Sequence, residues 1–192
     1  TIPKGHVIEN SQANSNGFTS GAAYIGDKVT IGLSLSSTSS EYGLVGHTSH
    51  EEEEDGHTTE DEHNEVLPFV KAKQQRYQMR GRWLDVSPKV SQLLITAAHT
   101  DYRLQEIEQQ NIATQISNNS NEVKVQAHHQ LFGPWQGVFG VHWQTSNVNP
   151  VGEEANSPAT TTDMAALFAT QKRRFGQYEW HVGARFERVR LT

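Results

Sequence analysis

Apolar and polar residues alternate along most of the chain with a repeat of two. In residues 29–36 every odd-numbered residue is apolar and every even-numbered one is small or polar. In residues 178–187 five apolar residues alternate with ionisable or small ones. A repeat of two is typical of a β-strand with one apolar face, so the pattern predicts a chain built of strands.

Eight strands are predicted between clusters of Gly, Pro, Asn and Asp: 18–25, 28–37, 69–84, 90–102, 121–132, 135–146, 161–171 and 177–190. The connections between them alternate in length. Short turns are expected at 26–27, 85–89, 132–134 and 172–176, and long connections at 38–68, 103–120 and 147–160. This alternation is the layout of an outer-membrane barrel, which has tight periplasmic turns and longer extracellular loops.

Two folds share this alternation. In a soluble β-sandwich the apolar face points into a core, whereas in a membrane barrel it meets lipid and the other face lines a polar interior. Strands of ten or more residues fit a tilted membrane strand, and aromatic residues near strand ends can form interfacial girdles. The aromatic candidates are Trp83, Tyr102, Trp135, Trp143, Tyr178 and Trp180. The barrel is therefore favoured, and the predicted fold class is all-β, an antiparallel up-and-down transmembrane β-barrel segment of about eight strands.

Composition removes several classes of protein. The 192 residues include no cysteine. There is consequently no disulfide, thiolate metal site or cysteine nucleophile. The longest apolar run is 164–169, far below the roughly 20 residues of a membrane-spanning helix. No nucleophile–base motif, phosphate-binding glycine loop or nucleic-acid-binding stripe is present, so neither an enzyme nor a nucleic-acid partner is predicted.

The charge is concentrated in one place. The net charge is −6, yet residues 47–65 hold nine acidic residues, four of the ten histidines and no Lys or Arg, and the rest of the chain carries +3. We call residues 47–65 the acidic segment. A stretch so charged and so poor in apolar groups is predicted to be a solvated loop without fixed secondary structure when unliganded.

The acidic segment has the chemistry of a divalent-cation site. Zinc takes neutral imidazole and carboxylate ligands, usually four of them. The absence of sulfur disfavours Cu(I), and the imidazoles disfavour a dedicated Ca²⁺ or Mg²⁺ site, while Ni²⁺, Co²⁺ and Cu²⁺ remain alternatives. The candidate ligands are His47, His50, Glu51, Asp55, His57, Asp61 and His63. The competing interpretation is an acidic surface loop whose histidines are incidental.

Four short motifs occur in a recognisable order. They are YIGDK at 24–28, EYGL at 41–44 leading into the acidic segment, TDYR at 100–103 and VGARFE at 182–187. With these motifs, residues 18–189 resemble the barrel part of TonB-dependent outer-membrane zinc receptors of the ZnuD type. VGARFE is common to TonB-dependent receptors at large, and the acidic segment is what points to zinc.

The resemblance implies a function and partners. It implies zinc capture and uptake across the bacterial outer membrane, with zinc as the transported ligand, loops facing the exterior, and outer-membrane lipid around the barrel. It implies contact with the TonB complex through an amino-terminal plug that this chain lacks, and a full barrel of about 22 strands, of which the chain is expected to be a part. It also offers Glu106 as a carboxylate for a metal at the plug apex.

Other interpretations remain open. One is a TonB-dependent receptor for another cargo such as haem, in which histidines also serve. Another is a soluble or surface-anchored metal-buffering or adhesin-like β domain. His128 and His129 must point to opposite faces of a strand, so they are predicted to be barrel-wall residues that share no metal. His142 and His181 are likewise predicted to be wall or interior polar groups.

Overall fold

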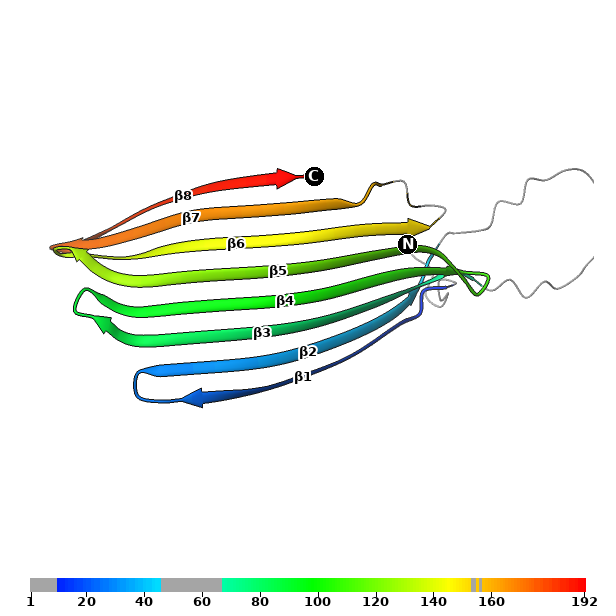
Figure 1. The fold of residues 1–192 in the computed structure, drawn as a ribbon, viewed down its shortest axis with the longest axis horizontal. Coiled ribbons are helices and arrows are strands. Elements are labelled where there is room, and N and C mark those ends of the chain that lie inside the picture. The colour runs from blue at the N-terminus through cyan, green and yellow to red at the C-terminus, as the bar shows by residue number, and fades with distance from the viewer. Residues whose placement is uncertain (1–9, 46–66, 153–154, 156) are drawn as a thin grey trace, which may run out of the picture.

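The chain folds into one antiparallel β-sheet (Figure 1). The computed structural model describes residues 10–45, 67–152, 155 and 157–192, which contain no helix. The strands are β1 (Ala13–Ile25), β2 (Val29–Gly43), β3 (Phe69–Ser87), β4 (Val90–Glu108), β5 (Asn111–Phe132), β6 (Trp135–Gly152), β7 (Thr160–Phe175) and β8 (Tyr178–Leu191). Each strand pairs with the next along the chain, so β1 and β8 are the two edges. The predicted all-β, up-and-down arrangement of eight strands is confirmed, and the described residues form one sheet rather than the two of a sandwich.

Seven of the eight strands are longer than predicted, and β1, β2, β4, β5 and β6 extend at the end opposite the short turns. β4 continues to Glu108 and β5 begins at Asn111, so the prediction of a long loop at 103–120 is wrong. A two-residue turn, Gln109–Gln110, joins these strands with positive φ at both positions, 45° and 68°. That geometry matches the right-handed twist of a hairpin. The loop predicted at 147–160 shrinks to 153–159 because β6 runs to Gly152. The connection predicted at 38–68 begins only after Gly43 and ends before Phe69.

The pairing register gives the sheet two distinct faces, because residues opposite each other in an antiparallel pair point the same way. We define the apolar face by the row Leu33, Met79, Ala97, Val123, Trp143 and Ala165. We define the polar face by the row Ser36, Arg76, Thr100, Ser120, Ser146 and Thr162. The alternation seen in the sequence therefore becomes a difference between two faces that extends across the sheet.

The described residues bury almost no apolar side chain. Only Val70, Ala98 and Ala166 among the apolar residues are buried. In contrast, Leu167 is 60% exposed and Phe186 is 72% exposed. A single layer has no second layer to pack against, and an apolar face of this extent is far larger than the patches monomeric soluble proteins leave exposed.

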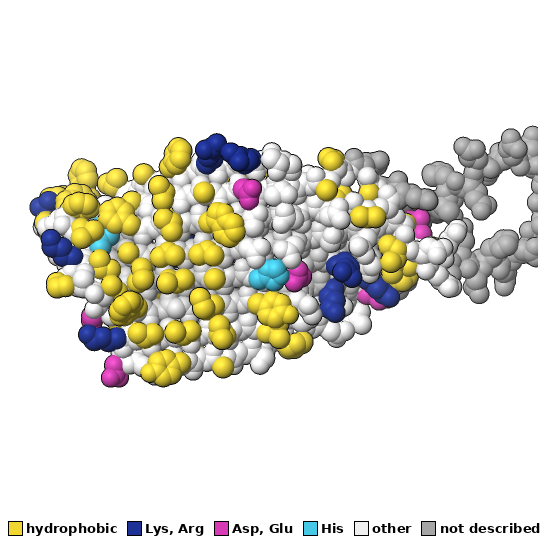
Figure 2. All heavy atoms as spheres, viewed as in Figure 1, with side chains coloured by type: hydrophobic (Ala, Val, Ile, Leu, Met, Phe, Trp, Pro, Cys, Tyr) yellow, Lys and Arg dark blue, Asp and Glu magenta, His cyan; other side chains and the backbone are white. Residues whose placement is uncertain are grey.

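The apolar side chains form a band on one face of the sheet, next to the short turns (Figure 2). On β2 and β6 the band covers three or four alternate residues, from Val29 to Leu35 and from Phe139 to Trp143, and on β8 it covers five, from Tyr178 to Phe186. Aromatic residues lie at its margins. Near the short turns they are Tyr24, Trp83, Phe132, Trp135, Phe175, Tyr178 and Trp180, and at the opposite margin Phe18, Tyr77, Trp143 and Phe186. Tyr102, also predicted for a margin, instead lies in register with Gln74 and Asn118 on the polar face.

The band is inclined to the direction of strand pairing. On β1 the residue of the band farthest from the short turns is Phe18, and on β8 it is Phe186. Followed strand by strand, the register links Phe186 to Tyr24 rather than to Phe18. This offset of roughly 20 Å over seven strand spacings of about 4.8 Å is an inclination of about 30°. Strands of a closed barrel tilt by about 35–45° from its axis, so a level band around a barrel would be inclined in this way on the unrolled sheet.

Candidate functional site

The ends of the connection that holds the acidic segment are fixed side by side. The Leu44 backbone N–H donates to the Pro68 carbonyl at 3.1 Å. The side-chain Nδ2 of Asn10 donates to the Leu44 carbonyl at 2.9 Å and to the Pro68 carbonyl at 2.6 Å. Asn10 is buried and has φ 56°, a left-handed conformation that asparagine adopts more readily than most residues. The connection therefore leaves and re-enters the sheet at one point, where β2 ends and β3 begins.

All seven predicted ligands in the acidic segment lie outside the described residues. They are His47, His50, Glu51, Asp55, His57, Asp61 and His63. Their mutual geometry therefore stays a prediction. What the structure does fix is the place from which the segment starts, at the end of the sheet away from the short turns.

The eighth predicted ligand, Glu106, lies near that place. It is on β4, in register with Val70 on β3 and with Thr114 on β5. Val70 is only two residues beyond Pro68, the anchored end of the connection. This row belongs to the polar face, because it is an even number of residues from the row of Thr100. Glu106 thus places a carboxylate on the polar face close to the base of the acidic segment.

Asn10 gives a direct test of this anchor. Asn10→Gly keeps the positive φ accessible but removes both hydrogen bonds to Leu44 and Pro68. We expect the free energy of unfolding to fall by about 1–3 kcal/mol, because the Leu44 carbonyl loses the Asn10 hydrogen bond in a part-buried site and the Pro68 carbonyl keeps only the one from the Leu44 N–H. The measurement is denaturant unfolding, with Asn14→Gly as the control, since Asn14 makes no side-chain hydrogen bond with the described residues. Equal losses in the two variants would show that Asn10 does not hold the connection.

A charged network lies in the middle of the polar face. Glu122 on β5 accepts from His142 Nε2 at 3.0 Å and lies 3.5 Å from Arg76 Nη2. Arg76 also donates to the Thr100 hydroxyl at 3.0 Å. This network links β3, β4, β5 and β6 by side chains in addition to the backbone ladder. It holds one carboxylate and one imidazole, and the described residues contain no group of three or more His, Asp or Glu able to hold a metal.

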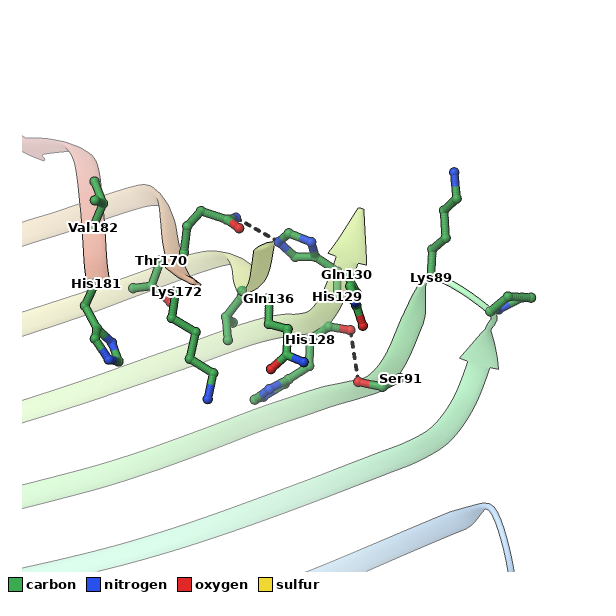
Figure 3. A pocket seen from close by; sticks show the side chains of 15 residues that line it. Lys89, Ser91, His128, His129, Gln130, Gln136, Thr170, Lys172, His181 and Val182 are labelled. Carbon is green, nitrogen blue, oxygen red and sulfur yellow. Dashed lines mark hydrogen bonds between the residues drawn. The ribbon is translucent and has the colours of Figure 1, made fainter. Parts of the chain in front are cut away.

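A second cluster lies on the polar face beside the short turns (Figure 3). His128, Gln136, Lys172 and His181 point to the same side of the sheet, around a hollow of about 660 Å³. His181 Nε2 lies 2.7 Å from Glu179 Oε1. None of the residues lining the hollow carries a carboxylate, so its chemistry suits anions better than metal ions.

His129 points away from this cluster, as predicted for a neighbour of His128 (Figure 3). Its ring stacks on Phe139 with centroids 4.2 Å apart, and its Nε2 lies 3.0 Å from Gln171 Nε2. It is buried, at 3% exposure. The two adjacent histidines therefore do not share a ligand. His129 instead packs against neighbouring strands of the sheet.

The sequence interpretation missed two features of this site. Asn10 is separated from its partners by 34 and 58 residues, and no local motif marks such a contact. The network of Arg76, Thr100, Glu122 and His142 joins four strands, and it becomes visible only once their register is known.

A scan of the chain against protein-family models finds no match. Within the described part of the chain, no helix is long and apolar enough to cross a membrane.

Proposed function

We propose that the chain is part of the wall of a bacterial outer-membrane β-barrel, belonging to a TonB-dependent receptor that captures zinc or a similar divalent cation for uptake. The observation that supports the membrane location is the inclined apolar band. It follows one face across all eight strands, has aromatic margins, and lies opposite a mainly polar face. On this proposal lipid covers the apolar band, and the polar face is the interior wall.

The metal-binding half of the proposal rests on the acidic segment. Nine carboxylates and four imidazoles start from one anchored point at the end away from the short turns. On this proposal that end faces the exterior. The negative charge raises the local concentration of cations, and groups of His and carboxylate then bind them.

Glu106 lies next along the proposed path of the cation from the acidic segment into the barrel interior. Its carboxylate is on the polar face, in the register row that begins two residues after the anchored Pro68. A cation released from the acidic segment therefore meets a carboxylate at the top of the interior wall. No catalytic step belongs to this proposal, because the cation is bound and passed on without chemical change.

The membrane location has a simple test. The full chain, refolded from denaturant in the presence of phosphatidylcholine vesicles, is expected to float with the vesicles in a density gradient. It should remain with them after a high-salt wash, because the apolar band rather than charge holds it there. A chain that is folded, monodisperse and vesicle-free in buffer without detergent would contradict the proposal and favour the soluble metal-buffering domain.

A further inference from the structure

A polar hollow lies on the same face as the apolar band, beyond the band at the end away from the short turns. Two adjacent cationic side chains line it. Lys73 on β3 and Arg103 on β4 are directly opposite each other in the register. Like charges in that position repel each other and destabilise a sheet unless an anion lies between them. Figure 2 shows Lys and Arg side chains gathered on this face beyond the band, at the end away from the short turns.

The acidic residue in the hollow is already engaged. Asp101 accepts from Asn119 Nδ2 at 2.6 Å through one oxygen, and its other oxygen lies 3.1 Å from His99 Nε2. The second ring nitrogen of His99 lies 2.8 Å from Asn121 Oδ1. Among the described residues, no ion pair includes Lys73 or Arg103. Two cations therefore face the hollow without a carboxylate of their own.

The rest of the hollow consists largely of hydrogen-bonding side chains. Its volume is about 470 Å³, and besides the two cations it is lined by Gln75, Ser117, Asn119, Asn147 and Asn149. Amide and hydroxyl groups of this kind bind phosphate oxygens or the hydroxyls of a sugar. Arginine in particular forms paired hydrogen bonds with phosphate.

An apolar groove adjoins the hollow on the same face. It has a volume of about 950 Å³, and its lining includes Met79, Ala97, Val123 and Trp143. His99 and Asn121 belong to the groove, and Asp101 and Asn119, two residues further along the same strands, belong to the hollow. The groove and the hollow thus form one surface. Its part nearer the short turns is apolar, and its part farther from them is cationic and rich in amide groups.

We infer that this surface binds one phosphorylated lipid, with its acyl chains in the groove and its phosphate between Lys73 and Arg103. The inference rests on the proposed membrane location and adds a partner to it. A lipid is favoured over a free anion because the groove continues directly from the hollow. A lipid is also favoured over a protein strand, because the surface lies in the middle of the sheet, where β3, β4 and β5 already have both neighbours.

The test is a titration of the full chain, in non-ionic detergent, with fluorescently labelled lipid A that carries its phosphates. We expect Lys73→Gln and Arg103→Gln to weaken binding about 5-fold each and about 30-fold together, since each cation near a lipid phosphate contributes about a factor of this size. Dephosphorylated lipid A should bind the unaltered chain about as weakly as phosphorylated lipid A binds the double variant.

The matched control is Arg80→Gln with Lys124→Gln, which removes one Arg and one Lys from the polar face of β3 and β5. Its affinity for lipid A is expected to stay within about 2-fold of the unaltered chain. Circular dichroism checks that both double variants retain their strands. Equal affinity in the two double variants, or equal affinity for the two forms of lipid A, would overturn the inference. Flotation with phosphatidylcholine vesicles reads the membrane location separately, because those vesicles contain no anionic lipid.

Discussion

Replacement of His47, His50, His57 and His63 together by asparagine is expected to weaken zinc binding by the full chain at least about 100-fold. Loss of a hydrogen-bond partner behind a ligand already costs about 10–100-fold in metal affinity, and this change removes the ligands themselves. The nine carboxylates of the segment remain, so a weaker electrostatic attraction for cations is retained. The measurement is isothermal titration calorimetry of the chain in detergent.

The matched control for this variant uses two histidines from the opposite end of the sheet. His128→Asn with His181→Asn removes imidazoles from the hollow beside the short turns, which lies far along the strands from the acidic segment. Zinc affinity in this control is expected to remain within about 3-fold of the unaltered chain. If the control lost as much affinity as the fourfold variant, zinc would be bound elsewhere than in the acidic segment.

The same titration at two pH values separates ligand binding from simple charge attraction. An imidazole binds metal only when neutral, and its ordinary pKa is about 6.5. Lowering the pH from about 7.5 to about 5.5 protonates the histidines but leaves most carboxylates ionised, because their pKa values lie near 4. We therefore expect a loss of zinc affinity on acidification in the unaltered chain and a much smaller one in the fourfold variant. No loss in the unaltered chain would mean that carboxylates alone hold the metal.

The sequence predicts the strands well where one side of each strand is apolar. The alternation is unbroken over residues 29–36 of β2 and 178–187 of β8, and these strands start within one residue of their predicted positions. Glycines in the short turns mark the strand ends at that side of the sheet, as at Gly133 between β5 and β6 and Gly176 between β7 and β8, both with positive φ. In these parts the local pattern and the fold agree, because every second side chain belongs to the apolar face.

The sequence fails where both faces become polar. Residues 117–121 are Ser, Asn, Asn, Ser and Asn, and they lie in the middle of β5. No alternation can be read from them, so the extension of β4 and β5 beyond the band was predicted as loop. The turn that ends the extension carries Gln109 and Gln110 at positions where Asn and Gly are usual. Pairing with neighbouring strands, rather than local preference, makes this part of the sheet.

The largest expected effect on stability comes from a charge in the middle of the apolar band. Val141 on β6 lies in the register row that runs from Val125 to Leu167. Val141→Arg is expected to lower the free energy of unfolding from phosphatidylcholine vesicles by about 2–4 kcal/mol, the effect of arginine at the midplane of a bilayer. The measurement is denaturant unfolding of the vesicle-bound chain.

Two further variants on the same strand separate lipid from any other cover. Thr145→Arg places the charge on the same face but just beyond Trp143, at the margin of the band. It is expected to cost only about 0–1 kcal/mol, because arginine near an interface reaches the headgroups. Gln144→Arg places the same charge on the polar face, in register with Glu122, and is expected to change stability by less than about 0.5 kcal/mol.

The decisive quantity is the gradient with depth between Val141 and Thr145. A bilayer produces such a gradient, because the penalty for a charge falls from the midplane to the interface. A second protein layer over the same face would bury both positions and penalise both charges, so comparable losses at the two sites would contradict the membrane location. A small loss at both would mean that the apolar face stays exposed to water. Only a loss that is large at Val141 and small at Thr145 agrees with a band that lies in lipid, with the cationic hollow of Lys73 and Arg103 at the depth of the headgroups.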